Sequence, residues 1–147
     1  MRNLIIHILF IAAVVAIGMF IGMHWQPGEW YAGLQKPFFT PPDAWFPIVW
    51  SALYAIIGLV GARVFLGGGP GLLWLLQMAL NFAWTPVFFG NHNMLAGFGI
   101  ITALWLTILA FIIKAWERDK ISSILFVPYA LWVTVAAALN GSLILLN

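Results

Sequence analysis

The sequence contains no cysteine and very little charge. Six basic and four acidic residues make up only 7% of its 147 residues, while 64% are hydrophobic. A soluble domain carries roughly 25% charged residues, and one of this size cannot bury so much apolar surface. We therefore predict an integral, multi-pass membrane protein surrounded by a lipid bilayer. No basic patch is interleaved with aromatic residues, so nothing indicates a nucleic-acid partner.

The absent cysteines exclude disulfides, thiolate metal ligands and a cysteine nucleophile. No two of the histidines His7, His24 and His92 share a helix face at the spacing of metal ligands. The apolar runs hold almost no ionisable residue, no paired carboxylates and no Ser-His-Asp arrangement. Proton-coupled transporters and hydrolytic enzymes need such groups, so neither is expected. We expect no metal and no required cofactor.

Long apolar runs divide the chain into five predicted membrane spans. The run from Val64 to Ile113 has no Lys, Arg, Asp or Glu, and as one helix it would measure about 75 Å, far more than a bilayer. Glycine-rich residues 67–71 and the Gly90–Asn93 segment supply the turns that break it. The sequence thus predicts one all-α transmembrane domain over 1–147. Its spans cover about 4–23, 45–63, 72–89, 94–113 and 121–146.

The basic residues are distributed asymmetrically about these spans. In a five-span arrangement all of them except Lys36 fall on one side: Arg2, Arg63, Lys114, Arg118 and Lys120. By the positive-inside rule, this asymmetry predicts a cytoplasmic N-terminus, with the loop after the first span facing out.

That loop, centred on the stretch from Trp30 to Trp50, is rich in proline and tryptophan. It is too long to be a simple connection and too aromatic to be disordered. It is either a structured cap over a ligand pocket or an interfacial segment that anchors the bundle through its tryptophans. We expect a short helix that starts at Pro27–Glu29 and runs through Leu34, and a helix cap at Asp43.

Neutral polar and aromatic residues recur along single faces of three spans. The spacing predicts stripes of Trp50 and Tyr54, then of Gln77, Asn81, Trp84 and Phe88, and then of Trp132, Ala136 and Asn140. Their amides either join helices to one another or, with the aromatic walls, line a pocket for a large, flat, mostly apolar ligand. The Gly18–Gly22 spacing similarly suits either a close helix approach or ordinary glycine usage.

Several motifs resemble those of the TspO/MBR family, which comprises the tryptophan-rich sensory proteins of bacteria and the mitochondrial translocator protein. The resemblance covers every span except the first and the fourth. It consists of ordered blocks over Trp30–Pro42, Phe46–Tyr54, Gln77–Gly90, Val127–Trp132 and Ala136–Asn140.

The resemblance implies a five-helix bundle, a homodimer, and a ligand pocket under the first loop. Family members bind porphyrins such as protoporphyrin IX and haem, benzodiazepine and isoquinoline ligands, and in some cases cholesterol. Carried over by position, the implied pocket is Tyr31, Trp50, Tyr54, Asn81, Trp84, Phe88, Trp132, Ala136 and Asn140. In similar bacterial members light-dependent porphyrin breakdown is attributed to two tryptophans, which match Trp50 and Trp132, and the implied location is the bacterial cell membrane.

One departure concerns sterols. Mammalian members carry a tyrosine and an arginine after the final Leu-Asn, whereas Leu139 and Asn140 are followed here by Gly141, Ser142 and an apolar tail. High-affinity cholesterol binding is therefore not expected. The hypotheses that remain are a tetrapyrrole receptor or sensor, a small transporter of hydrophobic compounds, and a light-dependent porphyrin-degrading protein that is no conventional enzyme.

Overall fold

A computed structural model describes all residues, 1–147, and contains helices but no strands. Five helical segments are long and apolar enough to cross a membrane, which confirms the predicted fold class. They are α1 (Arg2–His24), α3 (Trp45–Gly67), α4 (Gly71–Thr85) continued by the π-helical turn η1 (Pro86–Gly90), α5 (Met94–Ala115) and α6 (Lys120–Leu146).

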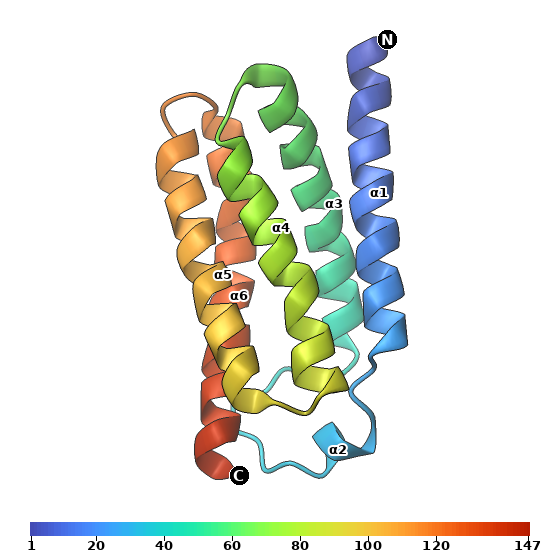
Figure 1. Ribbon diagram of the computed structural model, residues 1–147, viewed down its shortest axis with the longest axis vertical. Helices are drawn as coiled ribbons and strands as arrows, with labels where there is room; N and C mark the ends of the chain where they lie inside the picture. The colour runs from blue at the N-terminus through green and yellow to red at the C-terminus, as the bar shows by residue number, and fades with distance from the viewer.

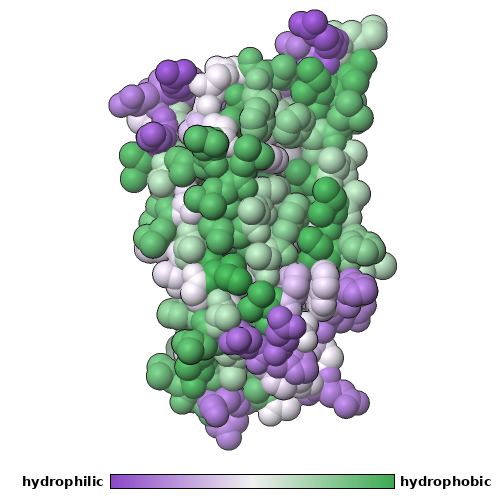
Figure 2. Space-filling model, in the orientation of Figure 1, coloured by the Kyte–Doolittle hydropathy of each residue, from purple (hydrophilic) through white to green (hydrophobic).

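The long helices stand side by side as a bundle (Figure 1). α1 packs mainly on α3, α3 also contacts α6, α6 packs on α5, and α5 on α4. The short helix α2, Gly28–Ala32, lies across the end of the bundle that also holds the C-terminus, and the N-terminus lies at the opposite end (Figure 1). Apolar residues cover the middle of the visible surface, and polar residues gather toward its two ends, as a membrane protein requires (Figure 2).

α1 and α3 approach closely at Gly58, where an added Cβ would lie 2.6 Å from the Cα of Ile11 and 2.8 Å from the carbonyl oxygen of Phe10. Of the pair noted in the sequence, Gly18 lies against the ring of Tyr54 with no room for a Cβ, whereas Gly22 has nothing within 4 Å of that position. The close approach of α1 to α3 is therefore not made by the Gly18–Gly22 pair. It is made at Gly58, where the two backbones come together.

Three predicted boundaries were wrong. The second span does not end at Arg63, because α3 continues to Gly67 and ends where Gly68 adopts a left-handed conformation with φ 76°. The short helix begins at Gly28, as expected, but ends at Ala32, two residues before the predicted end at Leu34. Asp43 does not cap α3, since the N-cap is Ala44 and no side chain bonds to the helix start.

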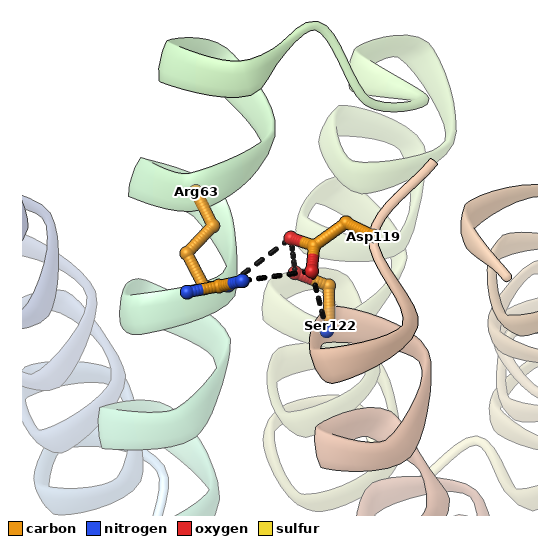
Figure 3. A network of polar contacts seen from close by, with 3 residues as sticks. All are labelled: Arg63, Asp119 and Ser122. Atoms are coloured by element: carbon orange, nitrogen blue, oxygen red, sulfur yellow. Dashed lines mark hydrogen bonds and ion pairs between the residues drawn. The ribbon is translucent and has the colours of Figure 1, made fainter. Parts of the chain in front are cut away.

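Arg63 instead forms an ion pair between α3 and the turn before α6 (Figure 3). Its Nη2 and Nε donate to the two carboxylate oxygens of Asp119 at 2.8 and 3.1 Å, and the Ser122 hydroxyl donates to the same carboxylate at 2.6 Å. Mainly through the Arg63 hydrogen bonds, the pKa of Asp119 falls to about 2. This pair fixes the bundle at the end away from α2.

Candidate functional site

A cavity of about 510 Å³ lies beneath α2, between the C-terminal part of α1, the N-terminal half of α3 and the end of α4 with η1. Its lining residues are Gly18, Met19, Gly22, Met23, Trp25, Gln26, Pro27, Gly28, Tyr31, Ala32, Asp43, Phe46, Pro47, Trp50, Tyr54, Trp84, Thr85 and Phe89. The loop that follows α2 is tied to the end of α6, because the Asn147 side chain accepts from the Gln35 amide at 3.0 Å and donates to its carbonyl at 2.9 Å.

Four of the nine predicted ligand-binding residues line this cavity: Tyr31, Trp50, Tyr54 and Trp84. The rings of Trp50 and Tyr54 are stacked, with centroids 5.6 Å apart and an interplanar angle of 28°, as their spacing of four on α3 predicts. Gly18 on α1 leaves the room that the Tyr54 ring occupies. The wall on this side is therefore flat and aromatic.

Asn81 does not line the cavity but lies in a buried hydrogen-bond chain behind it. The Tyr54 hydroxyl donates to Asn81 Oδ1 at 3.3 Å, and Asn81 Nδ2 donates to the Tyr129 hydroxyl at 2.6 Å. The Tyr129 hydroxyl in turn donates to Gln77 Oε1 at 2.8 Å. In this structure the amides of Gln77 and Asn81 join α3, α4 and α6, and the chain ends on Tyr54 at the cavity wall.

Asn140 has a similar joining position on the other side of Trp84. Its Oδ1 accepts from Trp84 Nε1 at 3.1 Å, and its Nδ2 donates to the Met94 carbonyl at 2.8 Å, so it links α6 to α4 and α5. Phe88 stacks on Trp84 with ring centroids 5.0 Å apart and is itself buried. Asn140, Phe88 and the buried Ala136 lie outside the cavity lining.

Two buried polar atoms have no hydrogen-bond partner: the hydroxyl of Tyr31 and Nε1 of Trp132. Tyr31 is only 3% exposed and lines the cavity from α2. Trp132 lies outside the lining but packs edge-on against the lining residue Phe46, with ring centroids 5.6 Å apart. Because buried polar groups in folded proteins nearly always have partners, these two atoms are exceptions within the bundle.

Burial, and to a smaller extent the negative charge of Asp43, raise the pKa of Tyr31 to about 12. Its hydroxyl therefore stays protonated at neutral pH and is available as a hydrogen-bond donor. No group of three or more His, Cys, Asp or Glu side chains that could hold a metal ion is present. The cavity presents aromatic faces and a few hydrogen-bonding groups.

The sequence interpretation missed the contribution of α1 and its following turn, which supply Gly18, Met19, Gly22 and the segment around Trp25. It also missed Asp43 as a lining residue. The Gly18–Gly22 spacing was the one available signal, but we read it as a possible helix contact. In the structure both glycines border the cavity.

A model of the TspO/MBR family matches residues 8–146, nearly the whole chain. The chain belongs to the TspO/MBR family. This membership confirms the resemblance found in the sequence motifs, and the match includes most of α1 and all of α5, which those motifs did not cover.

Relatives of this family member come from bacteria, an archaeon, a fungus and animals. It is 40% identical to Protein CrtK of Rhodobacter capsulatus, over 86% of this chain and 83% of the relative. It is 38% identical to the tryptophan-rich sensory protein of Cereibacter sphaeroides, over 83% and 79% of the two chains. It is 35% identical to the human translocator protein, over 85% and 80%.

Proposed function

We propose that this TspO/MBR family member is a membrane receptor or sensor that binds porphyrins, such as protoporphyrin IX and haem, in the aromatic cavity beneath α2. Other flat hydrophobic molecules, of the benzodiazepine and isoquinoline kinds, would bind at the same place. The observation that carries the proposal is the pair of unpartnered buried donors, on Tyr31 and Trp132, at and beside a cavity walled by Trp50, Tyr54 and Trp84. A ligand with acceptor atoms on a flat apolar frame satisfies both features.

The predicted residues divide into two groups under this proposal. Tyr31, Trp50, Tyr54 and Trp84 would contact ligand directly, because they line the cavity. The remaining predicted residues would hold those walls in place or meet a ligand only after small rearrangements: Asn81, Phe88, Trp132, Ala136 and Asn140.

A titration with protoporphyrin IX tests the proposal. The protein is purified in a nonionic detergent, and tryptophan quenching is followed in the dark against empty micelles. We expect saturation at a defined stoichiometry and weaker binding by Trp132→Phe. The matched control is Trp116→Phe, which removes a 48% exposed tryptophan at the C-terminal end of α5, outside the cavity lining, and should leave affinity unchanged. The proposal would be refuted by quenching that never saturates, or by equal affinity in the unaltered protein, Trp132→Phe and Trp116→Phe.

A second candidate function is movement of tetrapyrroles or other hydrophobic compounds across the membrane. The name translocator protein, carried by the human relative, supports it. Ligand flux into sealed vesicles that depends on the protein is the expected result, and saturable binding without flux would exclude it. Light-dependent porphyrin breakdown, with Trp50 and Trp132 as the participating indoles, predicts products under light that disappear in Trp50→Phe and Trp132→Phe.

Orientation, membrane and assembly remain predictions. The proposed location is a bacterial cell membrane, and the distribution of the basic residues favours a cytoplasmic N-terminus, with α2 and the cavity on the outer side. Since the chain has no cysteine, single cysteines placed in the α2 loop and in the α5–α6 turn can be labelled from either side without background. A homodimer is expected from the family, and cross-linking through cysteines on the outer face of α4, where Ala79 is exposed, tests it.

A further inference from the structure

The α2 end of the bundle holds a single Lys or Arg side chain, Lys36. No other Lys or Arg occurs between Arg2 and Arg63 in the sequence. Arg2 begins α1 at the opposite end, where the α5–α6 turn with its basic residues also lies (Figure 1). Arg63 is paired with Asp119 beside that turn. A ligand with free carboxylates in the cavity beneath α2 therefore has one permanent cation within reach.

The ammonium of Lys36 is held in place at the C-terminal end of α2. It donates to the carbonyl oxygens of Tyr31 at 2.7 Å, Leu34 at 3.2 Å and Ala32 at 3.4 Å. Carbonyl groups carry no net charge, so these bonds fix the ammonium without neutralising it. The ion pair in this structure joins Arg63 to Asp119 and does not involve Lys36. Its positive charge is thus positioned by the backbone but not paired with a carboxylate.

The same contacts bring this charge to the cavity wall. Tyr31 and Ala32 both line the cavity, and the ammonium also lies 4.5 Å from the centroid of the Tyr31 ring. A ligand carboxylate against this part of the wall would lie within about one Debye length of the ammonium, roughly 10 Å at 0.1 M salt. Lys36 is half-buried, so water and salt screen its charge less than that of an exposed side chain.

Two acidic side chains lie near the same end of the bundle, Glu29 on α2 and Asp43 before α3. Both are exposed, and only Asp43 lines the cavity. Because solvent surrounds them, their repulsion of a ligand carboxylate is more strongly screened than the attraction of the half-buried Lys36. The balance favours a carboxylate that lies toward the α2 wall and away from Asp43.

We propose that Lys36 is a specificity-determining residue of this cavity, whose ammonium favours flat apolar ligands with a carboxylate, such as porphyrins with free propionates, over neutral ligands of the same shape. The proposal rests on the function proposed above, because it assigns the charge of the ligand to that same cavity. The flat frame packs on the aromatic wall of Trp50 and Tyr54, and the carboxylate lies toward α2. The ammonium keeps its carbonyl acceptors and acts on the carboxylate as a charge across the wall.

Two forms of one macrocycle test this inference: protoporphyrin IX with free propionates and its neutral dimethyl ester. Each is titrated at neutral pH and low salt against the protein in a nonionic detergent, with empty micelles as the blank. The quantity compared is the dissociation constant of the ester divided by that of the free acid. Comparing this ratio between protein variants cancels the different partitioning of the two ligands into micelles.

Lys36→Met removes the charge but keeps a long unbranched side chain, and should lower this ratio roughly three- to tenfold. Loss of the hydrogen bonds to α2 can weaken both ligands alike, but such an effect leaves the ratio unchanged. Lys36→Arg retains the positive charge and should retain the ratio. Raising the salt concentration should lower the ratio in the unaltered protein and have little effect in Lys36→Met.

Lys120→Met is the matched control. Lys120 begins α6 at the end of the bundle opposite α2, and its ammonium lies 5.1 Å from the centroid of the Trp116 ring (Figure 1). The substitution therefore removes the same charge and a similar contact between an ammonium and an aromatic ring. It should leave the ratio unchanged, because its charge is far from the cavity.

The outcomes separate the two proposals. A ratio that falls in Lys36→Met but not in Lys36→Arg or Lys120→Met supports the inference. If both macrocycles bind saturably and Lys36→Met leaves the ratio unchanged, or Lys36→Arg or Lys120→Met lowers it equally, selection by Lys36 is overturned and the proposed function stands. If neither macrocycle binds saturably, both proposals fail.

Discussion

Gly58 offers the most direct test of how this bundle is held together. A Cβ at this position would lie 2.6 Å from the Cα of Ile11 and 2.8 Å from the carbonyl oxygen of Phe10, both backbone atoms of α1. Neither atom can turn aside as a flexible side chain would. For an ordinary contact of about 3.4 Å or more, α1 would have to retreat from α3 by about 1 Å.

Overpacking of this kind costs about 1–3 kcal/mol in a well-packed interior. We therefore expect Gly58→Ala to lower the apparent melting temperature by roughly 3–10 °C, measured by tryptophan fluorescence or size-exclusion chromatography after heating in detergent. Because α1 supplies Gly18, Met19 and Gly22 to the cavity wall, its retreat should also weaken saturable ligand binding.

Gly22→Ala is the matched control. It makes the same chemical change in another apolar, membrane-spanning helix, but nothing lies within 4 Å of the new Cβ. Its melting temperature should match that of the unaltered protein or rise slightly, since alanine favours helix more than glycine does. If Gly58→Ala were as stable as Gly22→Ala, the close approach of α1 and α3 and the reasoning built on it would be wrong.

Three further predictions concern polar contacts. Asn81→Leu removes one hydrogen-bond partner from each of two buried tyrosine hydroxyls and should lower the free energy of unfolding by about 1–2 kcal/mol, measured by SDS titration of mixed micelles. An unchanged unfolding curve would mean that the hydrogen bonds of Asn81 add no stability. The Arg63–Asp119 pair lowers the pKa of Asp119 below its unfolded value near 3.8, so its contribution of about 1 kcal/mol is present above that pH and lost as the pH falls toward 2. Asp119→Asn should remove this acid-dependent loss. Asn147→Ala removes both hydrogen bonds to Gln35 and should speed amide exchange in the loop around it while exchange in the long helices stays the same.

Much of this fold could be predicted from the sequence because the bilayer imposes strong rules. A membrane-spanning helix needs about twenty apolar residues, and a run too long for one span must turn where glycine and asparagine allow it. The five predicted spans therefore agree with the five long helices to within a few residues, apart from the end of α3 at Gly67. That end was misjudged because Arg63 was taken as a charge outside the membrane, whereas its ion pair with Asp119 holds it beside the bundle.

The candidate site was predictable only in part. Helical spacing correctly places Trp50 and Tyr54 on one face of α3, and the same rule aligns Gln77, Asn81 and Trp84 on α4 with Phe88 on η1. Spacing within one helix does not say which neighbour that face meets. As a result the sequence could not decide whether Asn81 and Asn140 face a ligand or bond to other helices, and in this structure they do the latter.

The sequence by itself determined the class of the protein, its helices and the aromatic character of its loop, since these follow from composition and local spacing. Only the tertiary structure decided that α1 borders the cavity, that Asp43 lines it instead of capping α3, and that Tyr31 and Trp132 keep donors without partners. These features depend on segments distant in sequence coming together. The close packing of α1 on α3 at Gly58 brings α1 to the cavity wall. No pattern within a single segment of the sequence predicts this packing.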